Sequence, residues 1–302
     1  MSEEDQGILL ESGTNELEVI MFSIGSSTFG INVIKVREII QPVDVTPMPE
    51  SHPNVKGIIR LRDEVIPVID LAKAIGFSST ERSGQDKYIV AELNQIKVAF
   101  HVDSVSRIHR ISWEQIEKPT KLSQGLKAMT IGVIKMKEDM VLLLDYEKIV
   151  VDISPEAGIH SERLTSLGER ERSHKKVTVV EDSPILRQLL RDTLEEAGYG
   201  QLTFYENGKE AWDTLESFSH QGTLDQNVDM VITDIEMPQM DGHHLTKRIK
   251  DHKEMRKLPT VIFSSLITED LYHKGKKVGA DAQVSKPEID RLVETMDQLL
   301  AD

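Results

Sequence analysis

The sequence predicts a two-domain protein, in which an all-β N-terminal half precedes an α/β half with a doubly wound, five-stranded parallel sheet. Three observations support this fold class. The chain has 302 residues, enough for two domains with separate cores. From Leu17 to about Val151 the apolar residues form short runs rich in Val and Ile, as in β-strands. From Val177 onward such runs alternate with helical patterns, as in parallel α/β sheets.

Seven runs in the N-terminal half are predicted strands, and turn-like pairs such as Asn94-Gln95 divide them. They are residues 17–24, 57–61, 65–71, 87–93, 96–102, 131–136 and 140–146. Short strands at this spacing indicate a small β-barrel architecture.

This half also contains an internal repeat. Residues 57–70 align with residues 132–145 without a gap, and a weaker similarity relates the segments near Phe29 and Val98. The coinciding residues are Gly57 with Gly132, Arg60 with Lys135, Arg62 with Lys137, Asp63-Glu64 with Glu138-Asp139, and Asp70 with Asp145. Any two hairpins share apolar alternation, but not matched glycines and charges. We therefore expect a double β-barrel of two related modules, with a groove between them as a natural binding site.

The segment between the two patterns is charged and contains Pro155, Gly158 and Gly168. We interpret it as a linker with a helical segment near 161–172. The predicted organisation is therefore an N-terminal tail (1–16), a β domain (17–151), a charged linker (152–175) and an α/β domain (176–302).

In the C-terminal half, residues 177–182 are a buried strand, and a helix with one apolar face follows and ends at Gly198. Further strands are expected at 202–206, 229–234, 260–265 and 282–286, with helical stretches between them and a last helix at 288–300. Five strands alternating with five helices imply that chemistry gathers at the carboxyl ends of the strands.

The strand ends carry complementary side chains. These are Glu181 and Asp182 on the first strand, Asp234 on the third, Ser264 on the fourth and Lys286 on the fifth. Clustered carboxylates repel one another, so this cleft calls for a hard divalent cation with oxygen ligands, most plausibly Mg²⁺. We expect Asp182 and Asp234 to bind it directly, Glu181 directly or through water, and the backbone carbonyl of Glu236 to add a ligand.

In such a cleft Asp234 acts as a nucleophile toward phosphorus and forms an acyl phosphate. Lys286 would balance the new charge, and Ser264 would donate a hydrogen bond to a phosphoryl oxygen. Each residue alone has an ordinary structural interpretation, as a helix cap or a solvated lysine. Their combination on the correct strands favours a phosphoacceptor site at Asp234.

From Lys175 to the C-terminus these motifs resemble a response-regulator receiver domain, whose fold is flavodoxin-like. The resemblance implies that Asp234 is the phosphoacceptor, Ser264 the switch hydroxyl and Lys286 the phosphoryl contact, with a cis bond before Pro287. Two departures stand out. Gln283 occupies a position where receivers often carry an aromatic switch residue, and Glu236 lies two residues past Asp234, where its charge affects access of hydrolytic water.

The N-terminal half resembles a CheW-like coupling domain with two SH3-like modules, through "VREI" at 36–39, "GIIRLRDEVIPVIDL" at 57–71 and the strand spacing. With a receiver after it and "SGTNELE" near the start, the order resembles the CheV family of chemotaxis adaptors. This resemblance implies binding to a CheA-type histidine kinase and to the cytoplasmic tips of chemoreceptors. Val36, Ile39 and Arg62 are candidate contacts, although core or solvated strand positions explain them equally well.

Composition limits the classes of partner. There are 51 acidic and 36 basic residues, a formal net charge of -15, and no long Lys/Arg run, so we expect no nucleic-acid partner and no direct membrane insertion. The absence of cysteine excludes disulfides, thiol nucleophiles and thiolate zinc sites. The acidic N-terminus lacks a signal-peptide pattern, and no apolar run approaches the roughly 18 residues of a membrane span. We expect a soluble cytoplasmic protein recruited to chemoreceptor arrays at the inner face of the membrane.

Three functions fit these features. The first is an adaptor whose coupling changes when the kinase phosphorylates Asp234, which gives feedback in sensory adaptation. The second is a phosphate sink that drains the kinase, with the coupling domain as a tether. The third is a Mg²⁺-dependent small-molecule phosphatase. We favour the first, in which the chain is no enzyme but a phosphoryl acceptor.

Overall fold

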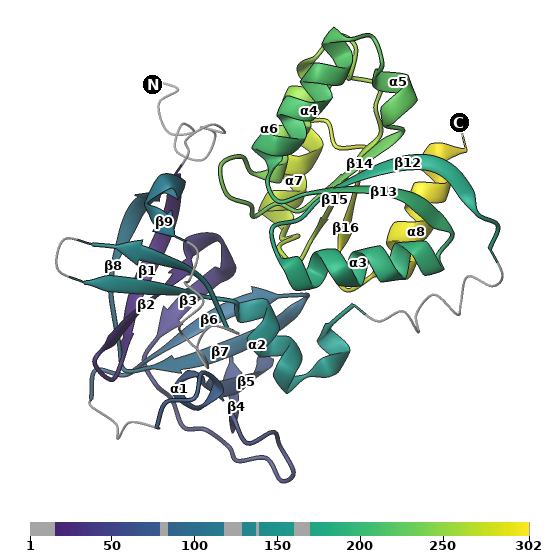
Figure 1. The fold of residues 1–302 in the computed structure, drawn as a ribbon. Helices are drawn as coiled ribbons and strands as arrows, with labels where there is room; N and C mark the ends of the chain where they lie inside the picture. Colours follow the sequence, from purple (N-terminus) through teal and green to yellow (C-terminus); the bar gives the residue numbers. More distant parts are fainter. Residues whose placement is uncertain (1–15, 79–83, 118–128, 137–138, 160–169, 302) are drawn as a thin grey trace, which may run out of the picture. The chain divides into compact units, whose positions relative to one another are not determined.

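The computed structural model describes residues 16–78, 84–117, 129–136, 139–159 and 170–301 (Figure 1). They divide into two compact units, Glu16–Gly158 and a second unit that begins at Ile159. Most of the predicted N-terminal tail, Lys137 and Glu138 of the repeat, and residues 161–169 of the predicted linker helix lie outside the described residues. No helix among the residues described is both long and apolar enough to cross a membrane.

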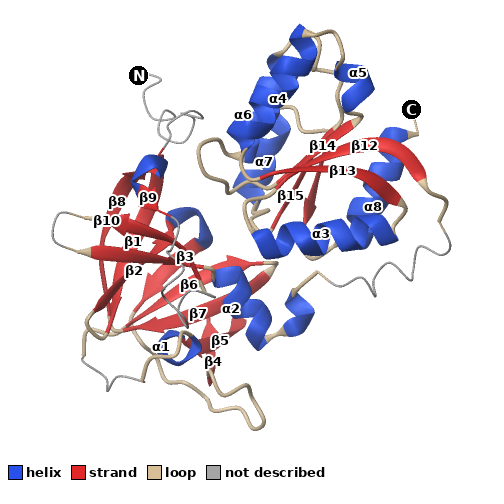
Figure 2. Ribbon diagram, viewed as in Figure 1, coloured by secondary structure: helices blue, strands red, loops and turns tan. Residues whose placement is uncertain are grey.

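The first unit consists of two antiparallel-rich sheets, which are drawn in red in Figure 2. One sheet has the order β8-β1-β2-β11-β10-β9, and the other has the order β3-β6-β7-β5-β4. The strands are β1 (Glu16–Ile24), β2 (Ser27–Asn32), β3 (Val36–Ile40), β4 (Val55–Leu61), β5 (Glu64–Asp70), β6 (Lys87–Leu93), β7 (Ile96–Val102), β8 (Ser104–Ser112), β9 (Ile116–Glu117), β10 (Thr130–Lys135) and β11 (Met140–Leu144). Short helices are η1 (Val33–Lys35), α1 (Leu71–Ala74), η2 (Trp113–Gln115), α2 (Tyr146–Ile153) and η4 (Pro155–Ala157).

Each sheet closes as a small barrel does. In the second sheet β3 and β4 stand at opposite ends of the strand order, yet the segment after β3 bridges Thr46 to Ile58 of β4. In the first sheet the end strand β8 continues through η2 into β9, which pairs with β10 at the other end. The predicted all-β fold of the N-terminal half is thus confirmed.

The two repeat segments form hairpins with the same register. Gly57 faces Val68 between β4 and β5, and Gly132 faces Leu143 between β10 and β11, each after a bulge. Both glycines lie where a side chain has no room. A Cβ at Gly57 would be 2.2 Å from the Thr46 carbonyl oxygen, and one at Gly132 would be 2.5 Å from Ile116 Cγ2. The two glycines of the repeat therefore share a structural requirement, which chance alternation would not produce.

The two modules exchange strands. β3 follows β2 in the chain but pairs with β6 of the other sheet, and β8 follows β7 but pairs with β1. The weaker sequence similarity also has a structural counterpart, since Gly30 on β2 pairs with β11 and Ala99 on β7 pairs with β5, both in parallel. The modules are therefore interlocked and not merely placed side by side.

The second unit is a parallel sheet of order β13-β12-β14-β15-β16 with helices on both faces (Figure 1). Its strands are β12 (Ser173–Val180), β13 (Tyr199–Tyr205), β14 (Met230–Thr233), β15 (Thr260–Ser264) and β16 (Ala282–Ser285). Its helices are α3 (Pro184–Glu196), α4 (Gly208–His220), α5 (Leu224–Asn227), α6 (Gly242–Asp251), α7 (Glu269–Lys277) and α8 (Ile289–Leu300). The predicted doubly wound fold is confirmed, with α5 as a single turn beyond the five expected helices.

Two apolar clusters hold the helices on this sheet. Leu190 and Leu194 of α3 and Leu292 of α8 belong to one cluster. Trp212 of α4 and Leu245 of α6 belong to the other. Helix α7 supplies no residue to either cluster. The two faces are therefore covered to different degrees.

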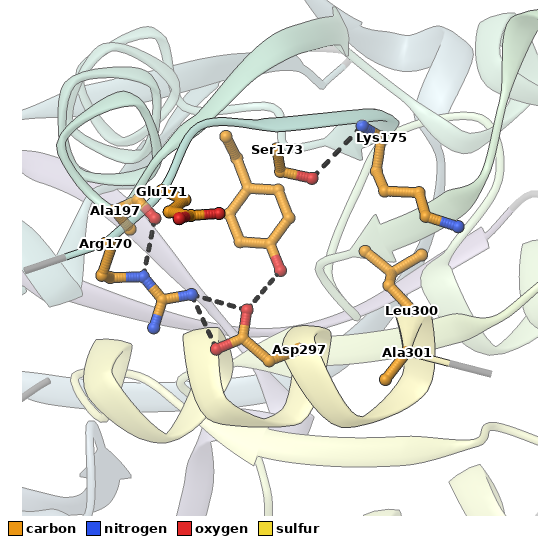
Figure 3. A pocket seen from close by; sticks show the side chains of 9 residues that line it. Arg170, Glu171, Ser173, Lys175, Ala197, Asp297, Leu300 and Ala301 are labelled. Atoms are coloured by element: carbon orange, nitrogen blue, oxygen red, sulfur yellow. Dashed lines mark hydrogen bonds and ion pairs between the residues drawn. The ribbon is translucent and has the colours of Figure 1, made fainter.

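Of the predicted linker, residues 152–158 belong to the first unit, whereas Ile159 and residues 170–175 belong to the second. Ile159 packs into the cluster that contains Leu190. The Arg170 guanidinium lies 2.6 Å from the Asp297 carboxylate of α8 and donates to the Ala197 carbonyl at 2.8 Å, and Tyr199 also donates to Asp297 (Figure 3). These residues line a cavity of about 220 Å³ that includes none of the predicted site residues. Residues 170–172 are not helical, unlike our expectation, and lead directly into β12, whose first residue, Ser173, donates to the Gly198 carbonyl at 2.9 Å.

We expect the helix caps of the repeat to stabilise the first unit. The Asp145 carboxylate accepts a hydrogen bond from Lys148 N at 2.9 Å, as Asp70 does from Lys73 N. Burial and then Glu147 raise the pKa of Asp145, so a neutral acceptor should be tolerated there. In urea unfolding, Asp145→Ala should lower stability by about 1 kcal/mol, and Asp145→Asn by clearly less. Equal losses for the two variants would contradict the capping role.

Candidate functional site

Three carboxylates meet at the carboxyl end of the parallel sheet. Glu181 and Asp182 follow β12, and Asp234 follows β14, which is the neighbouring strand with Val180 beside Thr233. One oxygen from each carboxylate lies within 4.8 Å of the others. Glu181 and Asp234 are buried, and Asp182 is partly exposed. The structure thus brings together the acidic residues that the sequence predicts.

Lys286 provides a cation that directly contacts two carboxylates of this cluster. It follows β16, and its side chain is only 2% exposed. Its Nζ lies 2.8 Å from Glu181 Oε2 and 3.1 Å from Asp234 Oδ2. The Lys286-Pro287 bond is cis, as the resemblance implied, and Lys286 N donates to the Ser264 carbonyl at 3.0 Å.

The charges in this cleft do not balance. Three carboxylates and one ammonium leave two net negative charges when all are ionised. Burial raises the pKa of Asp182 well above its usual range, Glu181, Asp234 and Glu236 raise it further, and Lys286 opposes this in part. A bound cation would relieve the repulsion. Because the donors are carboxylate oxygens, they suit a hard divalent cation.

The loop after Asp234 has little freedom. Asp234 Oδ1 accepts from Ile235 N at 2.6 Å, and its carbonyl accepts from the Thr233 hydroxyl at 2.9 Å. A Cβ at Gly242 would be 1.9 Å from that carbonyl oxygen, so α6 can begin there only with glycine. Buried Met237 and Met240 then anchor the loop in the core, and Asp241 caps α6. The motif "DIEMPQMDG" is therefore a rigid support for the Asp234 carboxylate.

Ser264 ends β15, next to β14, and its side chain is buried. Its hydroxyl oxygen accepts from Leu266 N at 3.3 Å, within its own loop. Glu236 is partly exposed, and its charge acts on Asp182. Both residues therefore lie at the same end of the sheet as the carboxylates.

Arg187 is a site residue that sequence reasoning missed. From α3 its Nη1 donates to the backbone carbonyls of Glu181 at 2.7 Å and Asp182 at 2.9 Å, and its Nη2 lies 3.0 Å from Glu206. These bonds fix the backbone that carries the acidic pair. The sequence offers no signal for this role, because a helical arginine is ordinarily solvated.

The candidate contacts of the first unit lie close together. Ile39 is 39% exposed on β3, and Val36 is half-buried at the start of that strand. Arg62 lies in the β4-β5 turn with a positive φ of 56°, and its Nη2 is 3.3 Å from Glu38 Oε1. Arg62 therefore reaches β3, the strand that carries Val36 and Ile39, through its ion pair with Glu38.

His243 is a buried group between α6 and α7 of the second unit. It is the second residue of α6, is 1% exposed, and donates from Nε2 to the Leu271 carbonyl of α7 at 3.3 Å. Burial and then Lys274 lower its pKa to about 4, although Asp241 opposes the shift. The imidazole is therefore neutral in the folded chain near pH 7.

Protonation of His243 should destabilise the second unit in acid. The unfolded chain takes up this proton near pH 6.5, whereas the folded chain takes it up only near pH 4. Stability is therefore present above pH 6.5 and falls as the pH drops toward 4, by about 3 kcal/mol in total. Urea unfolding followed by Trp212 fluorescence in a Trp113→Phe background measures this loss.

His243→Gln should remove that part of the pH dependence. His273→Gln is the matched control, since His273 is exposed on α7. The same pH slope in the parent and in His243→Gln would contradict the assignment.

Each of the two units matches a known protein family. The CheW-like domain family matches residues 18–154, and the response regulator receiver domain family matches residues 177–297. Chemotaxis protein CheV3 of Helicobacter pylori is 30% identical over 278 residues, which cover 90% of this chain and 88% of the relative. CheV1 of the same organism is 26% identical over 295 residues, covering 90% and 89%. Chemotaxis protein CheW of Thermotoga maritima is 32% identical over 150 residues, covering 50% and 98%.

Proposed function

The chain belongs to the CheV family of chemotaxis proteins, and from this membership we propose that phosphorylation of Asp234 modulates its action as a chemotaxis coupling adaptor. The N-terminal unit binds a CheA-type histidine kinase and the cytoplasmic tips of chemoreceptors, with Val36, Ile39 and Arg62 at the contact surface. The protein works in the cytoplasm, at receptor arrays on the inner face of the membrane. It is a phosphoryl acceptor and not an enzyme with a separate substrate.

The observation that carries this proposal is the buried cluster of Glu181, Asp182 and Asp234 with Lys286 bridging two of its members. A carboxylate oxygen of Asp234 attacks the phosphorus of a phosphohistidine, so an oxygen–phosphorus bond forms as the nitrogen–phosphorus bond breaks. The electron pair of the broken bond stays on the imidazole, which takes a proton from solvent. This chemistry needs charge compensation at the acceptor, since both reactants are negative.

Each residue of the cleft has its own role in the phosphoryl transfer. Asp182, Asp234, Glu181 and the Glu236 carbonyl form the Mg²⁺ site, and the cation supplies charge neutralisation at the phosphoryl oxygens when bound. Lys286 would contact the phosphoryl group, because its Nζ already lies 3.1 Å from Asp234 Oδ2. Ser264 donates its hydroxyl proton to a phosphoryl oxygen. Arg187 keeps the acidic pair in place by holding its two carbonyls.

Glu236 supports a second candidate, the phosphate sink. Its carboxylate is partly exposed and its charge reaches the cluster, so it is placed to orient hydrolytic water toward the acyl phosphate. In this case rapid turnover matters and the affinity for the kinase does not change. Equal affinities of the phosphorylated and unphosphorylated chain for kinase and receptor would favour the sink.

Asp234→Asn should separate these functions in reconstituted arrays of receptor, kinase and adaptor. We expect the variant to couple receptors to the kinase as the parent does. Its coupling should stay constant after kinase activation, whereas that of the parent changes. Receptor-controlled kinase activity is the readout, and Asp251→Asn, exposed at the end of α6, is the matched control. Identical adaptation with the parent and Asp234→Asn would contradict modulation by phosphorylation.

A further inference from the structure

Helix α7 is attached to the second unit with little apolar packing. Gly275 is the one buried residue along its length. By contrast, α6 buries Leu245 and Ile249, and α8 buries Leu292, Val293 and Met296. Since apolar burial supplies most of the stabilisation of a docked helix, α7 must be held by other contacts.

Two side chains hold the backbone of α7 at consecutive carbonyls. His243 of α6 donates to the Leu271 carbonyl at 3.3 Å, and Gln283 of β16 donates to the Tyr272 carbonyl at 2.8 Å. The two donors come from different elements. The position of α7 therefore depends on a few polar contacts, and such elements open at low free energy.

The Gln283 amide occupies a space that only glycine leaves open. A Cβ at Gly275 would lie 2.0 Å from Gln283 Oε1 and 2.3 Å from its Cδ. Gln283 Oε1 is itself buried without a hydrogen-bond partner. An unsatisfied buried acceptor weakens an otherwise close fit, so this contact is well shaped but poorly stabilised.

The contact between Gln283 and α7 lies close to Ser264, since α7 follows Ser264 in the chain and β16 pairs with β15 in the sheet. Gln283 pairs with Ile262 on β15, and Ser285 pairs with Ser264. After Ser264, only residues 265–267 precede Thr268, which caps α7 by accepting from Leu271 N. A change in the Ser264 loop is therefore passed to α7 through a short connection.

We propose that Gln283 is a positioning residue, which holds α7 in the unphosphorylated chain and releases it when Ser264 turns toward a phosphoryl group on Asp234. The release rests on the proposed function, because it needs an occupied Asp234. The holding contact does not, since it exists in the unmodified chain. In this chain the contact between the Gln283 amide and Gly275 therefore sets the position of α7. In receivers the position of Gln283 is frequently occupied by an aromatic residue.

Hydrogen exchange of the full chain tests the holding contact first, with Mg²⁺ and without any phosphoryl mimic. Gln283→Leu keeps the size of the side chain but removes the donor, so residues 269–278 should exchange about fivefold faster than in the parent. Gly275→Ala should also speed their exchange, although alanine favours a helix, because its methyl group expels the amide. Gln221→Leu, at the exposed end of α4, is the control.

Unchanged exchange of α7 in Gln283→Leu would overturn the proposal. Exchange of α8, which packs in the core, verifies that each variant remains folded. Faster exchange throughout the unit in Gly275→Ala would make that variant uninformative about α7 alone, and Gln283→Leu then decides.

Beryllofluoride, a phosphoryl mimic, tests the release. In the parent it should raise the hydrogen-exchange rate of residues 269–278 toward that of Gln283→Leu without beryllofluoride. It should also bind Gln283→Leu about fivefold more tightly, because no contact remains to be broken. Equal affinities with an intact parent response would contradict the release. A parent that does not bind beryllofluoride would contradict the proposed function, while the comparison without the mimic still decides the holding contact.

Discussion

Repulsion among Glu181, Asp182 and Asp234 is the constraint on which the second unit depends. Their oxygens lie within 4.8 Å of one another, and Lys286 pairs with Glu181 and Asp234. Such a cluster persists because rigid neighbours impose it. Arg187 binds the carbonyls of the acidic pair, and Gly242 lets α6 pack against the Asp234 carbonyl. The fold thus keeps the three carboxylates close together. A bound cation, alone or with a phosphoryl group, would reduce the repulsion among them.

The two units differ in how their strands and helices are held together. In the first, β3 and β8 are exchanged between the two sheets, so the two modules are interlocked. In the second, most helices are fixed by apolar clusters, whereas α7 is held by hydrogen bonds from His243 and Gln283. Only residues 265–267 separate Ser264 from the Thr268 cap of α7. This division suits an adaptor whose binding module is constant and whose receiver changes.

Much of the fold and of the candidate site was predictable from the sequence. Apolar periodicity indicates the strands and helices, and the polar residues at the strand ends indicate the site. The fold class, the five parallel strands and the hairpin repeat follow from alternation and from Gly57 and Gly132. Strands β2, β3, β8 and β9 were not predicted. The partners of β3 and β8 lie far away in the sequence, and β3 alternates between half-buried and exposed residues. The roles of Arg187 and of Gly275 with Gln283 depend on neighbours that no sequence spacing reveals. Likewise, the predicted linker reads as charged chain, yet Arg170 meets Asp297 far along the sequence.

The most direct test of the central claim is transfer of labelled phosphate from an autophosphorylated CheA-type kinase to the full chain. We expect label on the parent and on Asp251→Asn, none on Asp234→Asn, and loss of transfer when Mg²⁺ is chelated. Decay of the label then measures the lifetime of the acyl phosphate. Equal labelling of Asp234→Asn, or transfer that is undiminished without a divalent cation, would contradict the account.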